Sequence, residues 1–207
     1  MKTQWDLSHF YTSMSDKEIE SDISAIKRAY DAFAKKYQNK TDYLQNENAL
    51  LKALQEYETL HVKASGKPLY YFLYIRELDS ENHAADARLN KLSDELTHYE
   101  NKVLFFTLNL GKISKSDQRR FLKSPKLIQY RYFLERLFLS SAYDLSEAEE
   151  RILNLKSLTS HTLWVDGFEK TLNKQTVYFK AEILLSRRQW EKYQPYLAKS
   201  GLRCIQR

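Results

Sequence analysis

The 207-residue sequence is poor in glycine, proline and cysteine. It holds only four Gly and three Pro, and because these residues punctuate strands and turns, their scarcity predicts a mainly helical chain. The single cysteine, Cys204, excludes an internal disulfide and is typical of a reducing compartment. No apolar run approaches the ~18 residues of a membrane-spanning helix, and the N-terminus lacks the apolar core of a signal peptide. We therefore expect a cytoplasmic protein that does not enter a membrane.

Motifs that carry chemistry are also missing. The sequence contains no HExxH zinc motif, no glycine-rich phosphate loop and no CxxC pair. Glu149 and Glu150 are adjacent, and neighbouring helical side chains point about 100° apart, so capping and solvation explain them better than acid–base work. The histidines never fall four residues apart, and we interpret them as ordinary surface or core residues: His9, His61, His83, His98 and His161. The sequence thus predicts no catalytic residue, no metal ligand and no cofactor-binding residue.

The positive charge is concentrated at one end of the chain. A net charge of +6 and a pI of 9.1 suggest a nucleic-acid partner. However, residues 187–207 hold six basic residues against Glu191 alone, which leaves residues 1–186 at about +1. The basic stretch 112–136, with Tyr130 and Tyr132, keeps nucleic-acid binding open as an alternative. Its apolar residues stand at helical spacing, which favours a solvated helix face and no nucleic-acid partner.

The sequence is rich in residues that can form a packed core, since 43% are hydrophobic and 14% are aromatic. Apolar stripes at helical spacing predict a helix from a Ser15–Glu18 capping box to Tyr37 and another over about residues 46–64, stopped by Gly66. Pro68 starts an aromatic helix that is apolar on all sides, which predicts deep burial. Ser80 caps a long helix that ends at Gly111, and Ser124-Pro125 opens a further one. The stripe of the long helix predicts a central packing seam: Ala85, Leu89, Leu92, Leu96, Tyr99, Val103, Phe106 and Leu110.

The stretch 143–173 is the most strongly specified. Ser146 and Glu149 form a capping box, and helical spacing then predicts apolar packing by Ile152, Leu155, Leu158, Leu163, Trp164 and Phe168. After it, "KQTVYFK" alternates with the period of a strand, which predicts a short strand or hairpin near residues 174–185. The fold class is therefore all-α, an elongated multi-helix bundle with that one β element.

Four stretches resemble one family in order and in register. They are "WDLSHFYTS" (5–13), "YYFLYIRELDSEN" (70–82), "ENKVLFFTLNLGKI" (100–113) and "YDLSEAEERILNLKSLTSHTLWVDGFEKTLN" (143–173). Through them the chain resembles the N-terminal region of oligoendopeptidase F, a thimet-type zinc metallopeptidase, from about Trp5 to Lys180. The resemblance implies a helical lobe that lines a channel for oligopeptides. The family's zinc ligands stand in an HExxH helix and a later Glu, which this sequence does not contain.

The resemblance divides the chain into three parts. Residues 1–173 are expected to form the helical lobe, 174–186 to begin the missing catalytic domain, and 187–207 to be an aberrant tail. We expect the tail to be translated out of frame. Codons can be chosen for its residues that, read one frame over, encode a peptide more similar to the family's continuation than the tail is. We therefore expect a truncated oligoendopeptidase F that is inactive alone and binds no zinc. An exposed apolar patch is expected where the second lobe would dock, with self-association there. The alternative is a stand-alone helical module that binds peptides or proteins.

Overall fold

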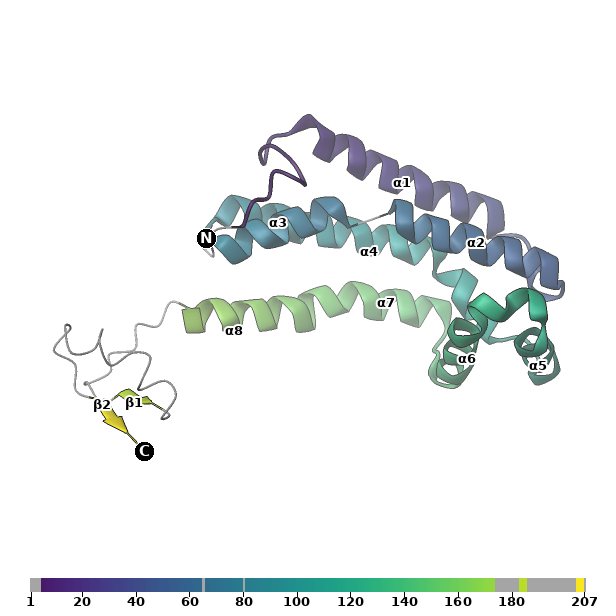
Figure 1. The fold of residues 1–207 in the computed structure, drawn as a ribbon. Helices are drawn as coiled ribbons and strands as arrows, with labels where there is room; N and C mark the ends of the chain where they lie inside the picture. Colours follow the sequence, from purple (N-terminus) through teal and green to yellow (C-terminus); the bar gives the residue numbers. More distant parts are fainter. Residues whose placement is uncertain (1–4, 65, 80, 174–182, 186–203, 207) are drawn as a thin grey trace. The chain divides into compact units, whose positions relative to one another are not determined.

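The computed structural model describes residues 5–64, 66–79, 81–173, 183–185 and 204–206 (Figure 1). These residues belong to two compact units, Met1–Trp164 and Val165–Arg207. Every regular element among the described residues of the first unit is a helix, which confirms the all-α prediction. Its elements are α1 (Lys17–Tyr37), η1 (Asp42–Leu44), α2 (Glu47–Lys63), α3 (Lys67–Leu78), α4 (His83–Gly111), α5 (Lys115–Lys123), η2 (Pro125–Tyr130), α6 (Arg131–Ser140), η3 (Ser141–Tyr143), α7 (Glu147–Ser157), the π-helical turn η4 (Leu158–Thr162) and the start of α8 (Leu163–Asn173).

The long helix α4 organises the first unit, since it contacts α1, α3, α6 and α7 (Figure 1). Phe106 is 0% exposed and lies at the centre of the larger apolar cluster. Its ring contacts four aromatic rings from α1, η1 and α2: Phe33, Tyr37, Tyr43 and Tyr57. A smaller cluster near the start of α4 joins Tyr11, the first half of α1, Tyr71 and Phe72 of α3, and the α4 residues Ala85, Leu89 and Leu92. The fold therefore has two neighbouring cores that share α1 and α4.

The apolar stripes predict these cores well. All six apolar residues predicted to face inward from α1 are buried: Ile19, Ile23, Ile26, Tyr30, Phe33 and Tyr37. On α4, six of the eight predicted positions are buried, whereas Leu96 and Tyr99 are only half-buried against the larger cluster. These two residues fall between the inward positions of the two clusters, so the predicted seam is interrupted there.

Three predicted helix ends are wrong in detail. Asp16, not Ser15, caps α1, because its carboxylate accepts a hydrogen bond from the Glu18 amide. Asn82, not Ser80, caps α4 by accepting from the Ala85 amide. Gly66 does not stop α2, which ends at Lys63 with Ala64 as its C-cap. Gly66 is instead the N-cap of α3. Each predicted end differs from the observed one by one or two residues, which is the usual variation of helix ends.

Two predictions about whole helices also need correction. The aromatic helix α3 buries Pro68, Tyr71 and Phe72, but Tyr70 and Leu78 are exposed, because neighbouring helices cover only one side of it. Helix α5 was not predicted. Its Ser114 cap accepts from the Asp117 amide, and its Gln118 side chain donates to the carbonyls of Gly111 and Ile113. The Ser124-Pro125 start gives a 3-10 turn before α6 rather than one continuous helix.

The second unit contains the rest of α8 and two short strands. Strand β1 (Ile183–Leu185) pairs in parallel with β2 (Cys204–Gln206), with Ile183 opposite Cys204. A strand near 174–185 was predicted, and β1 lies at its end. However, the described partner of β1 is a later segment in parallel, and a hairpin would pair antiparallel. The predicted strand over 174–180 and most of the predicted tail lie outside the described residues.

Candidate functional site

The five histidines are scattered along the chain, and only His83 and His98 share an element, α4. The His61 ring on α2 packs at a tilt against the Tyr57 ring, and its Nδ1 lies 2.8 Å from the Tyr57 carbonyl oxygen. His98 on α4 lies 3.8 Å from an Asp94 carboxylate oxygen one turn earlier. His83 begins α4, His161 belongs to η4, and His9 lies in the turn before α1. Among the described residues no three His, Cys, Asp or Glu side chains are grouped so that they could hold a metal ion.

Glu149 and Glu150 serve the start of α7. Glu149 accepts from the Ser146 amide at 2.9 Å while its own amide donates to the Ser146 hydroxyl, so the predicted capping box is confirmed. Hydrogen bonds from the Ser146 side chain and then from its backbone hold the pKa of Glu149 below its usual value. Glu150 accepts from the Leu145 amide at 3.0 Å. Both carboxylates are thus engaged in helix capping.

The basic stretch 112–136 packs against the body of the first unit. Its apolar residues Phe121, Leu127 and Leu134 are buried in the larger cluster. Arg120 donates to the Gln45 carbonyl, and Lys126 donates to Asn48, each at 2.8 Å. Two of its cations therefore hold α5 and η2 against the start of α2. This agrees with the interpretation of the stretch as helix surfaces on a core.

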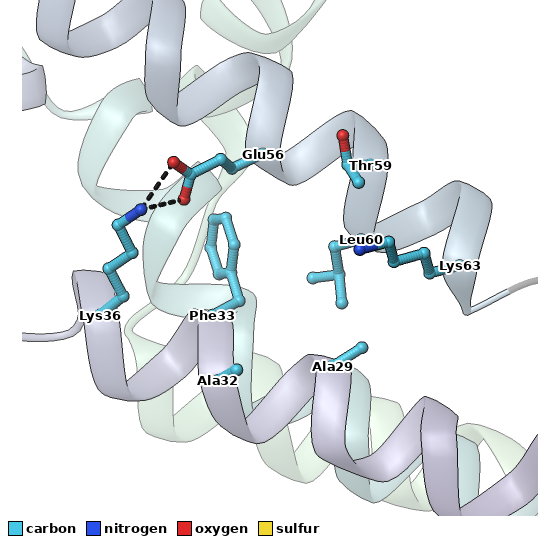
Figure 2. Close-up of a pocket in the computed structure, with 8 residues that line it drawn as sticks. All are labelled: Ala29, Ala32, Phe33, Lys36, Glu56, Thr59, Leu60 and Lys63. Atoms are coloured by element: carbon cyan, nitrogen blue, oxygen red, sulfur yellow. Dashed lines mark hydrogen bonds and ion pairs between the residues drawn. The ribbon is translucent and has the colours of Figure 1, made fainter.

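A shallow groove of about 220 Å³ lies between α1 and α2 (Figure 2). Buried Phe33 and Leu60 form its floor, and Ala29 and Ala32 keep one wall low. At one end the Lys36 ammonium bridges to both carboxylate oxygens of Glu56, at 2.6 and 2.5 Å (Figure 2). The remaining lining residues are Thr59 and Lys63. The groove is apolar with charged ends, and it offers no nucleophile or acid–base pair.

Helix α7 is oriented with its polar side inward. It buries no residue, and its half-buried side towards α4 consists mostly of polar residues: Glu147, Glu150, Arg151, Asn154 and, beyond the helix, Leu158. Asn154 donates to the buried Asn101 of α4 at 2.8 Å, and Arg151 pairs with Glu147 at 2.7 Å. The predicted packing is wrong at five of the six apolar positions, because only Leu158 is half-buried and the other five are exposed: Ile152, Leu155, Leu163, Trp164 and Phe168.

We define the outer face of α7 as Glu149, Ile152, Leu153 and Lys156, all of which are exposed. At 100° per residue, Ile152 and Leu153 lie side by side in its middle, with Glu149 one turn before them and Lys156 one turn after. Sequence reasoning found the apolar residues of α7 but assigned them to the core. The polar set at 147, 150 and 154 has the same helical spacing, so spacing alone does not show which side of α7 faces inward.

The part of the chain that the structure describes contains no helix long and apolar enough to cross a membrane. No curated protein and no solved structure matches the chain. A family model described as oligopeptidase F matches residues 109–174, which run from the last turn of α4 to the end of α8 and include α7. The resemblance to the N-terminal region of oligopeptidase F is therefore confirmed over residues 109–174.

Proposed function

We propose that residues 1–173 form the helical N-terminal lobe of a truncated oligopeptidase F-type zinc peptidase, and that the chain does not hydrolyse peptides by itself. The match over residues 109–174 carries the proposal. In this role the lobe supplies one wall of a channel for oligopeptides. The two aromatic cores around α4 stabilise the lobe, whereas the outer face of α7 is exposed and available to a partner.

The zinc that the family uses does not fit the residues at hand. The sequence has no HExxH, and the described residues bring no three ligand side chains together. A catalytic zinc site needs three protein ligands and an open position. In this role the lobe contributes shape and packing, and its residues carry out no chemical step.

A peptidase assay tests the proposal. The purified chain is mixed with a quenched fluorescent peptide and zinc, with and without a chelator, and bound metal is measured by native mass spectrometry. We expect no chelator-sensitive turnover and less than one equivalent of zinc. Turnover that a chelator abolishes, together with stoichiometric zinc, would overturn the proposal.

The second candidate function is a stand-alone module that binds peptides, and the groove between α1 and α2 favours it. Anisotropy of labelled short peptides measures such binding. Ala32→Trp fills the groove (Figure 2) and should abolish binding there, whereas Ser24→Trp, on the exposed surface of the same helix outside the groove, should not. Equal affinity in both variants argues against the groove as the binding site.

A further inference from the structure

The outer face of α7 carries charges of opposite sign at its two ends. The first turn of α7 is acidic, with Glu147, Glu149 and Glu150, and the last turn is basic, with Lys156. Lys156 is exposed and forms no ion pair within the described residues. Between the charges, Ile152 is 57% exposed and Leu153 is 51% exposed. Along this face an acidic side chain is therefore followed by two large apolar side chains and then by a basic side chain.

When a second copy of this face is turned end to end, its basic end meets the acidic end of the first copy. We propose that the outer face of α7 is an interface that binds a second copy of this chain, with the two α7 helices antiparallel about a two-fold axis. The axis passes between Ile152 and Leu153, so that Ile152 of one copy packs on Leu153 of the other. Glu149 then faces Lys156 of the second copy at both ends of the contact.

Charge complementarity selects this occupant and this orientation. A two-fold interface uses the same patch on both copies, so the patch has to complement its own reversed image. An antiparallel pair places each acidic end beside a basic end and also aligns the helix dipoles favourably. A parallel pair would place Glu149 beside Glu149 and Lys156 beside Lys156, and like charges repel. Burial of Ile152 and Leu153 in both copies supplies the apolar contribution.

The first experiment measures the oligomeric state of the full chain by sedimentation velocity over a concentration series. We expect a reversible dimer. Ile152→Glu should raise the dimer Kd at least about tenfold, because it places a charge in the centre of the contact. Val62→Glu is the matched control, since Val62 is 71% exposed on α2 and the change in charge is the same. Its Kd should equal that of the parent chain.

The second experiment determines the orientation of the pair by oxidative cross-linking in a Cys204→Ser background. Leu153→Cys lies beside the axis and should cross-link to its own copy. Lys156→Cys lies one turn away on the same face and should not, because the two copies of residue 156 are separated along the helix axes. Cross-linking at both positions indicates a parallel pair and overturns the proposal.

A monomer at all concentrations also overturns the proposal, as does a dimer whose Kd Ile152→Glu leaves unchanged. Heterogeneous aggregates without a defined dimer point to non-specific association through exposed apolar side chains and count equally against it. If the chain stays monomeric and an added protein lobe covers this face, the face belongs to that lobe and the proposal is overturned. These outcomes are independent of the peptidase assay, so failure of the proposed function and failure of the interface are distinguishable.

Discussion

Helices α1 and α7 are both amphipathic and both open with a side-chain cap, yet they use their apolar sides in opposite ways. Helix α1 buries six large apolar residues against α2, α3 and α4. Helix α7 buries none and contacts α4 through Asn154 and its half-buried charged neighbours. Because apolar burial is the dominant favourable contribution to folding, α1 is part of the stabilising core, whereas α7 depends on its cap and on polar contacts.

The apolar residues of α7 are therefore free to contact a partner, whereas those of α1 are already used in folding. A buried polar contact contributes about 1 kcal/mol net, which is less than the contribution of one buried aromatic side chain. The apolar residues of α7 contribute little to the folded chain while they stay exposed, and they contribute fully once a partner covers them. Four sets of substitutions test whether the core and α7 differ in this way.

The largest expected effect is in the core. Phe106→Ala removes the ring at the centre of the larger cluster and should lower the free energy of unfolding by about 3–5 kcal/mol. Ile152→Ala, on the outer face of α7, should change it by less than about 0.5 kcal/mol. Urea denaturation followed by circular dichroism gives both values. Equal losses would mean that α7 packs its apolar side into the fold.

Gly111 tests the contact between the end of α4 and η3. A Cβ at this position would lie 2.7 Å from Cβ of Ser141, an approach that backbone movement has to relieve. We expect Gly111→Ala to cost about 1–3 kcal/mol in thermal or urea unfolding. Gly167→Ala in α8 is the matched control, since nothing lies within 4 Å of its Cβ position and alanine favours a helix over glycine. If Gly111→Ala leaves the free energy of unfolding unchanged, η3 moves readily to accommodate the added methyl group.

The Asn101–Asn154 hydrogen bond tests how α7 is held. Asn154→Leu leaves the buried Asn101 without this partner and should cost about 1–3 kcal/mol. The double variant Asn101→Leu, Asn154→Leu replaces both amides and should recover most of that loss. Hydrogen exchange of α7 amides should accelerate in the single variant and return towards the parent rate in the double variant. No change in exchange would mean that the hydrogen bond does not hold α7.

The smallest effect is expected at the capping box. Ser146→Ala should cost about 1 kcal/mol of local helix stability and speed hydrogen exchange in the first turn of α7. The lowered pKa of Glu149 adds a dependence on pH. Its folded-state pKa lies below the ordinary value of 4.5, so its stabilisation is present above that value and is lost as the pH falls through the folded pKa. Glu149→Gln should remove this dependence, and an unchanged pH profile would contradict the assignment.

The helical class and most of the core follow from local patterns in the sequence. Four-and-three spacing identified every buried apolar residue of α1, and the Ser146 capping box fixed the start of α7 to the residue. Scarce glycine and proline excluded a β-rich fold over the described first unit. These features depend on contacts within one or two helical turns, so they are encoded locally.

The side of α7 that faces inward, in contrast, depends on how the helices pack together. Both its apolar set, Ile152 and Leu155, and its polar set, Glu147, Glu150 and Asn154, have helical spacing, so periodicity cannot choose between them. The hydrogen bond from Asn154 to Asn101 joins residues 53 positions apart, and the aromatic packing around Phe106 joins α4 to three other elements. The orientation of a helix depends on which surface the rest of the chain offers it, and that surface exists only after the other helices have packed.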